Sequence, residues 1–345
     1  MTASRTASML ISLIAIVFIL IKGQELIVPL VLATMLWALV RETKQGMDKS
    51  RFMRDKIPGW IKSLLISAAL TGIVGLLFKI LINSTKSVTK SYDLYKSNVA
   101  VITNKINELF DIDLATLLGN QLDELNFATL FSSLLNELTG IFSSAFMILL
   151  YILFIFLEEA NFSSKMKVVV KNESQYQKLV DVLESIEDSV TKYLGLKIFV
   201  SLVTGVLSYF ALIFIGVDGP VFWAFLIFIL NFIPTIGSLV ATLFPAMFSV
   251  LQFAEFGPGL MVLGLVGSIQ LVVGNFLEPR IMGNSLNISS LVAIFSLMLW
   301  GAIWGITGML LSVPITVIIV IILSQFPQTR NLAIMLSKDG SIVEQ

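Results

Sequence analysis

Long apolar runs separated by short polar segments dominate the chain. The runs cover residues 9–21, 26–40, 57–82, 141–157, 193–215, 221–251, 260–277 and 288–323. An α-helix rises about 1.5 Å per residue, so about 20 apolar residues cross the hydrocarbon core of a bilayer. The pattern therefore predicts an all-α, polytopic membrane protein with about eight membrane segments.

Composition supports this class of protein and removes several others. Of the 345 residues, 56% are hydrophobic and 13% are charged, whereas about a quarter are charged in soluble domains. With 23 basic and 23 acidic residues, the chain lacks the positive charge of a nucleic-acid binder, and no nucleic-acid partner is expected. It contains neither Cys nor His and no Gly-Lys pair of a P-loop, so we expect no metal site and no cofactor.

Basic residues between the second and third runs predict the topology. The loop carries Arg41, Lys44, Lys49, Arg51, Arg54 and Lys56. Because short basic loops stay on the inside, we expect the N- and C-termini in the cytoplasm and segment 83–140 outside. Arg5 before the first run also fits a cleaved signal peptide, but no small-x-small cleavage site follows, which favours a retained first helix.

These features divide the chain into five regions. They are N-terminal transmembrane helices (1–82), an extracytoplasmic helical insert (83–140), a fourth span with a cytoplasmic amphipathic helix (141–192), a C-terminal transport core (193–326) and a cytoplasmic tail (327–345). In the insert, apolar residues step by three and four from Tyr92 to Leu109 and from Phe127 to Leu138. Such stripes fit a helical cap that covers itself, or a docking surface for another protein.

The run 221–251 contains residues that break helices. At about 45 Å as a single helix, it is too long for one span. Asn231, Pro234 and Gly237 lie near its middle, where Pro removes a backbone donor and Gly weakens the helix. We therefore predict a break there and a re-entrant hairpin. A long kinked span is the alternative.

The run 288–323 has a similar pattern. Gly301, Gly305 and Gly308 favour close packing of helices, and Pro314 is expected to interrupt the helix near its end. Broken helices at membrane depth line cavities or are covered by protein. We expect the two broken segments to bring polar groups to a solute within the bilayer.

Charged residues are rare between positions 193 and 337, where they are Lys197, Asp218, Glu255, Glu278, Arg280 and Arg330. A charge at the bilayer centre costs about 2.5–3.5 kcal/mol on insertion scales, so each needs a partner, water or an interface. Asp218 and Glu255 adjoin Gly-Pro turns, which indicates an interface.

The densest polar cluster of this half lies between the two broken runs and includes Asn275, Glu278, Pro279, Arg280, Gly283 and Asn284. Proline disfavours a helical residue before it, so Glu278 is expected to be extended, with both charges held by a rigid turn. There they can pair with each other or bind a polar ligand, to which Asn231 and Gln270 would add hydrogen bonds. The alternative is an ordinary cytoplasmic helix end that follows the positive-inside rule.

Three motifs in this half are similar to those of the autoinducer-2 exporter (AI-2E) family. They are Pro234-Thr-Ile-Gly237, Glu278-Pro279-Arg280-Ile-Met-Gly283, and Trp300-Gly301 through Gly305-Ile-Thr-Gly308 to Pro314. The family often has Pro shortly after the Glu-Pro turn, where this chain has Asn287-Ile-Ser289-Ser290. The resemblance implies a homo-oligomeric transporter of a bacterial inner (plasma) membrane. It implies release of the quorum-sensing signal autoinducer-2, or sodium/proton antiport.

Export of a small polar solute is the function we expect. In a sodium/proton antiporter, Glu278 would exchange a proton for a monovalent cation, but Arg280 nearby opposes protonation of that carboxylate. A structural or scaffolding membrane protein is the third possibility, and it leaves the turn from Glu278 to Arg280 without a role. Catalysis is not expected, since no nucleophile and base occur in a recognisable arrangement.

Overall fold

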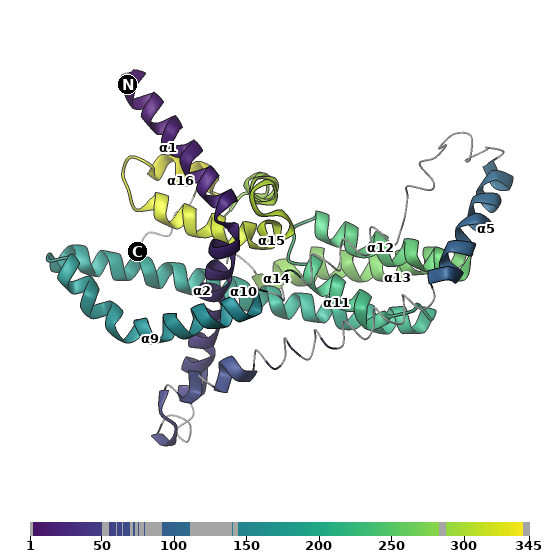
Figure 1. Cartoon of the computed structure of the whole chain (residues 1–345), viewed down its shortest axis with the longest axis horizontal. Helices are drawn as coiled ribbons and strands as arrows, with labels where there is room; N and C mark the ends of the chain where they lie inside the picture. The colour runs from purple at the N-terminus through teal and green to yellow at the C-terminus, as the bar shows by residue number, and fades with distance from the viewer. Residues whose placement is uncertain are drawn as a thin grey trace. The chain divides into compact units, whose positions relative to one another are not determined.

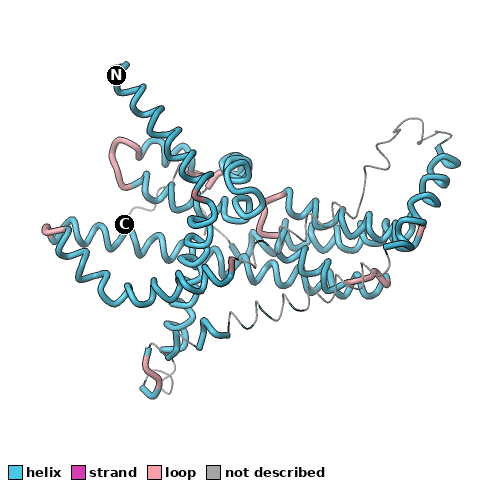
Figure 2. Tube along the Cα trace, in the orientation of Figure 1, coloured by secondary structure: helices cyan, strands magenta, loops and turns pink. Residues whose placement is uncertain are grey.

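The computed structural model describes residues 3–49, 55–59, 61–63, 65–69, 72, 75, 79, 92–110, 140, 144–282 and 288–340. In these residues the backbone forms helices, turns and loops without a strand (Figure 2), which confirms the all-α prediction. The chain divides into two compact units. Unit 1 holds Met1–Ala69, Ile141–Gly195 and Gly283–Gln345, and unit 2 holds Leu70–Gly140 and Leu196–Met282.

Several helices are long and apolar enough to cross a membrane. In the described part of the chain they are α2 (Gln24–Asp48), α10 (Glu173–Ile215), α12 (Ile236–Phe253), the stretch Phe256–Met282 and α15 (Ser290–Ser324). A sixth is α9 (Ala145–Val169), which bends by 64° between Glu159 and Asn161. Many large apolar side chains remain exposed on these helices and on α1 (Ala3–Lys22), as expected of surfaces that face lipid.

In unit 1, α2 packs against α9 around Ala33, Ile148 and Ile152. Polar side chains join the ends of these helices. The Trp37 indole nitrogen donates to Glu159 at 3.0 Å, and Arg41 pairs with Glu187 of α10 at 2.7 Å. The amphipathic start of α10 is therefore anchored to α2 by charge. From there α10 continues without a break to Ile215.

Helix α15 folds back on itself. Ser296 Oγ donates to the carbonyl oxygen of Ser312 at 3.0 Å, although sixteen residues of straight helix would separate them by about 24 Å. The reversal lies at Trp304 and Gly305, whose backbone angles are not helical. The predicted break at Pro314 is wrong, because Pro314 lies buried inside the second half of the helix.

The glycines of α15 serve different purposes. A Cβ on Gly308 would overlap the Trp300 carbonyl, and one on Gly301 would meet the flexible Met309 side chain at 2.9 Å. Both glycines therefore let the two halves approach closely, as predicted. Gly305 has open space around its Cα but a φ of +61°, a conformation that L-residues rarely adopt. The reversal needs Gly305 for its backbone, and the prediction that Gly305 serves packing is wrong.

The C-terminal helix α16 (Arg330–Leu336) packs against α15. The Ser289 amide donates to the Leu336 carbonyl at 3.1 Å, while the Ser289 side chain accepts from Val292 and caps the start of α15. The described part of the segment predicted as a tail therefore belongs to unit 1.

Unit 2 is built on a hairpin of α11 (Pro220–Leu230) and α12, with α13 (Phe256–Val272) packed along α12 (Figure 1). The predicted break is confirmed at residues 231–235, between the two helices. A Cβ on Gly237 would overlap the Leu230 carbonyl, so the tight tip requires glycine. At the other end, the Gln252 side chain accepts from Asp218 N at 2.7 Å and donates to Gly216 O at 2.8 Å.

Helix α5 (Tyr92–Phe110) is the described part of the predicted external insert, and it packs against α12. Tyr95 and Ile102 of the predicted stripe are buried. The apolar stripe of α5 is therefore packed against α12 of the same chain. The second predicted stripe, 127–138, lies outside the described residues.

Candidate functional site: a buried ion pair at the hairpin tip

A polar stripe follows the buried face of α10. Lys197, Ser201, Thr204 and Ser208 recur at helical spacing of four, three and four residues, and each is at most 4% exposed. Residues at this spacing lie on one face of a helix. The glycine at position 205 lets this face approach α11, since a Cβ there would lie 3.1 Å from the Ala224 carbonyl. The face that carries polar groups is thus turned inward.

Lys197 is paired with Glu278. The lysine ammonium contacts Oε1 of Glu278, whose side chain is 25% exposed whereas that of Lys197 is 5% exposed. A buried ammonium without a counter-charge is strongly unfavourable, and the Glu278 carboxylate supplies that counter-charge to Lys197. The pair is net neutral and still partly open to solvent on the glutamate side.

A wide helical turn places Glu278 opposite Lys197. Residues Val273–Leu277 form a π-helix, and the Glu278 amide donates five residues back to Val273. In an unbroken α-helix Leu277 would follow Gln270 on the buried face, because seven residues make about two turns. The π-turn takes up one extra residue, so Glu278 reaches that face instead.

The predicted extended conformation of Glu278 is therefore wrong. Glu278 has helical angles of φ −57° and ψ −50° and begins the short helix α14 (Glu278–Met282). Pro279 fits here because its missing amide donor falls in the first turn of α14. The proposed pairing with Arg280 is also replaced, since Glu278 pairs with Lys197 and the Arg280 side chain is exposed.

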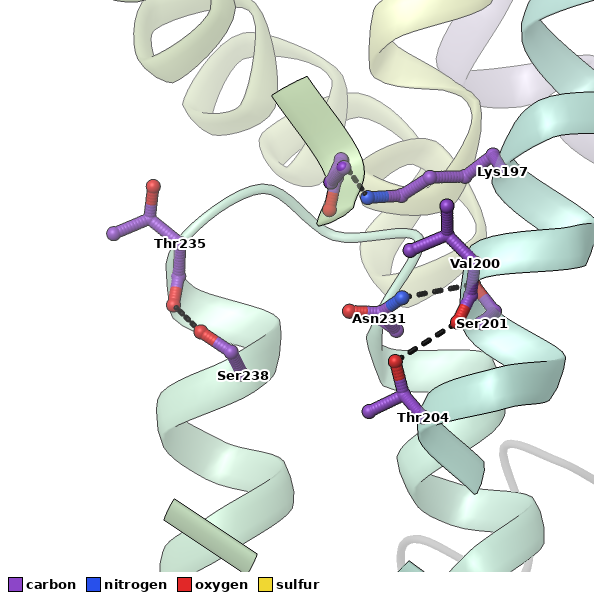
Figure 3. A network of polar contacts seen from close by, with 8 residues as sticks. Lys197, Val200, Ser201, Thr204, Asn231, Thr235 and Ser238 are labelled. Carbon is purple, nitrogen blue, oxygen red and sulfur yellow. Dashed lines mark hydrogen bonds and ion pairs between the residues drawn. The ribbon is translucent and has the colours of Figure 1, made fainter. Parts of the chain in front are cut away.

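Further polar side chains of the hairpin tip and of α10 lie close to the ion pair (Figure 3). Asn231, the residue that follows α11, donates its side-chain amide to Ser201 Oγ at 3.0 Å. Thr204 Oγ1 donates to the Val200 carbonyl within α10, and Ser238 Oγ donates to the Thr235 carbonyl. Thr235 has a φ of +59°, which is unusual for a β-branched residue and marks local backbone strain.

The ion pair lies near one end of unit 2. Helix α12 has 18 residues, which is about 27 Å, close to the thickness of a hydrocarbon core. The N-terminus of α12 is at the hairpin tip. In α10, Lys197 lies about as far from the last residue, Ile215, as the two ends of α12 lie from each other. The pair therefore lies at the hairpin-tip end of unit 2, about the length of α12 from the opposite end.

Gln270 is the buried polar residue of α13 on the face that Glu278 joins. It is 8% exposed, and its Nε2 donor has no hydrogen-bond partner among the described residues. An unsatisfied buried amide is costly unless a ligand or water completes it. Gln270 thus offers a free donor about two helical turns from the ion pair.

The other predicted site residues divide into three groups. Asn231, Pro234 and Gly237 form the hairpin tip beside the stripe of α10. Asn275 and Arg280 are exposed and make none of the contacts described above. Gly283 and Asn284 lie outside the described residues.

Lys197 is the site residue that sequence reasoning did not include. The chain pattern held a usable signal, since Lys197 is the one lysine within the run 193–215 and Ser201, Thr204 and Ser208 continue its helical face. A charge and three hydroxyls on one face of a membrane helix indicate a polar lining or a buried partner.

The long apolar helices and the comparison with known proteins together identify a multi-pass membrane transporter. Residues 8–328 match the profile described as AI-2E family transporter, and the chain belongs to this family. It is 32% identical over 321 residues to the AI-2 transport protein TqsA of Escherichia coli strain K12, covering 91% of this chain and 90% of that one. A transport protein of Haemophilus influenzae is 30% identical over 335 residues, 94% of each chain.

Proposed function

We propose that unit 2 exports a small polar solute and that the pair of Lys197 and Glu278 controls entry at the hairpin tip. The supporting observation is a partly buried, net-neutral ion pair placed by a π-turn beside Asn231 and Ser201. Under the predicted topology, α5 is extracytoplasmic, so the tip end of unit 2 faces the cytoplasm. A solute that leaves the cell would meet this pair first.

The charges of the site favour a neutral, hydroxylated solute. Lys197 offers donors, Glu278 offers acceptors, and the Asn231 amide offers both, so hydroxyl groups can replace the contacts that the residues make with each other. The E. coli relative is named for autoinducer-2 transport, and we propose an autoinducer-2-like molecule as cargo. A bare monovalent cation would instead have to displace the Lys197 ammonium from its carboxylate.

Counterflow in vesicles tests this proposal. Purified protein is reconstituted with autoinducer-2 inside, and its release is compared for wild type, Glu278→Gln and Lys197→Met. We expect both variants to transport much more slowly, because neither can form the charged gate. Glu255→Gln is the matched control, since Glu255 is an exposed carboxylate at the other end of the same stretch of helix.

The same vesicles separate export from antiport. A Na⁺ pulse is applied while an internal pH dye reports proton movement. We expect no proton flux that depends on Glu278. The antiporter would be established instead by two results together: the wild type moves protons on the Na⁺ pulse without releasing solute, and Glu278→Gln moves none.

A further inference from the structure

Helix α5 contacts the rest of unit 2 through one face. Tyr95, Asn98, Ile102 and Lys105 are spaced by three or four residues, which puts them on one side of a helix. Tyr95 and Ile102 are buried on this side. Asn98 Nδ2 donates to the carbonyls of Leu251 at 2.8 Å and Gln252 at 3.1 Å. This face is therefore mixed, with polar groups placed among apolar ones.

The polar groups of α5 complete the end of α12. The last carbonyls of a helix have no partners within it, and a cation is favoured there by the helix dipole. Lys105 Nζ donates to the carbonyl of Ala254, the residue that ends α12 with a φ of +54°. With Asn98 on the preceding carbonyls, α5 supplies the cap for α12.

Tyr95 extends the contact to the turn between α10 and α11. Its hydroxyl donates to Asp218 Oδ2 at 2.8 Å, and its ring packs edge-on against Phe248 of α12 at 5.1 Å. The Asp218 amide in turn donates to the Gln252 side chain. Helix α5 thus holds both ends of the hairpin together, at the end of unit 2 opposite its tip.

We propose that α5 is a movable strap that closes this far end of unit 2 and must lift for solute to leave. The inference rests on the proposed function, in which solute enters at the ion pair. The ion pair and the α5 contacts are linked by two helices. Helix α10 carries Lys197 and ends at the turn that Tyr95 contacts. Helix α12 runs from the hairpin tip to the carbonyls that Asn98 and Lys105 contact. A tilt of the hairpin loosens one end as it tightens the other.

The contacts of α5 suit reversible release. Among the described helices, α5 packs mainly against α12. Most of its specific contacts are hydrogen bonds to carbonyl and carboxylate oxygens, which water can replace at small net cost. The α12–α13 packing is different, since a Cβ on Gly259 would overlap Val250, and interdigitated packing resists separation.

Cross-linking tests the strap, and the absence of native Cys means that only introduced thiols react. Asn98→Cys is combined with Gln252→Cys and joined by a short reducible cross-linker in reconstituted vesicles. We expect release of autoinducer-2 to fall to the level of protein-free vesicles and to recover on reduction. Unchanged release after complete cross-linking overturns the proposal. The pair Ala100→Cys with Asn104→Cys, on the exposed side of α5, is the control and leaves release unaffected.

A second measurement needs no solute and so remains informative if the proposed cargo is wrong. Ile102→Cys places a thiol on the buried face of α5, and Val101→Cys places one on the exposed face. A membrane-impermeant maleimide should label Cys at position 102 slowly, and several-fold faster once Tyr95→Phe and Lys105→Met are added. Labelling at position 101 should be fast in both backgrounds. If the two substitutions leave the rate at position 102 unchanged, α5 is a fixed cap.

Discussion

Lys197 and Glu278 form an ion pair across 81 residues of sequence. The pair ties the middle of α10 to the end of the α13 stretch, beside the tip of the α11–α12 hairpin. The lysine side chain is buried, whereas the glutamate is 25% exposed.

Removal of either partner should destabilise the protein unequally. Glu278→Gln leaves a lysine that is 4% exposed without a counter-charge, at a cost of about 3–5 kcal/mol. Lys197→Met leaves a glutamate that still reaches water, so its cost should be smaller. Thermal unfolding of both variants in the same detergent shows which of them loses more stability. The double variant should recover much of the loss, and a double variant less stable than Glu278→Gln would show that the two residues do not act as a pair.

Gln270→Leu should separate stability from transport. The substitution removes a buried donor that has no partner in the described part of the chain, so the unfolding temperature should stay the same or rise. Solute release should fall if the amide contacts solute. Unfolding and vesicle release are measured on the same preparation. Lower stability with normal release would mean that Gln270 is satisfied by structure and has no role in transport.

Gly237→Ala should damage the hairpin tip. The added methyl would overlap the Leu230 carbonyl, and overpacking of this kind costs about 1–3 kcal/mol. Gly264→Ala in α13 is the matched control, because its Cβ would meet nothing within 4 Å. Only the change at Gly237 should lower the unfolding temperature. Equal unfolding temperatures of the two variants would contradict the close approach of Gly237 to the Leu230 carbonyl.

The reversal in α15 should depend on Gly305 and not on Pro314. Gly305→Ala forces an alanine to a φ of +61°, at a cost of about 1–3 kcal/mol. Pro314→Ala should preserve the reversal, since the residue lies inside a continuous helical half. Cysteines at Ser296 and Ser312 report the fold-back by cross-linking. Loss of the cross-link in Pro314→Ala, with retention in Gly305→Ala, would reverse this assignment.

Local patterns determined the class of protein and the place of one break. The long apolar runs specify membrane helices because each must bury its backbone polar groups within itself. Asn231, Pro234 and Gly237 indicate the hairpin tip because they act on the backbone where they stand. The family resemblance, now shown across residues 8–328, depended on the same local motifs.

Tertiary structure decided the partners of the charges. Glu278 pairs with Lys197 rather than Arg280 because a π-turn rotates it toward α10, and one extra residue in a turn leaves no clear mark in the sequence. Gly305 rather than Pro314 makes the second reversal, because a membrane helix tolerates a buried proline whereas only glycine readily takes the reversed backbone angles. Apolar periodicity shows which residues are buried, but the contacts between segments distant in sequence depend on how the helices pack.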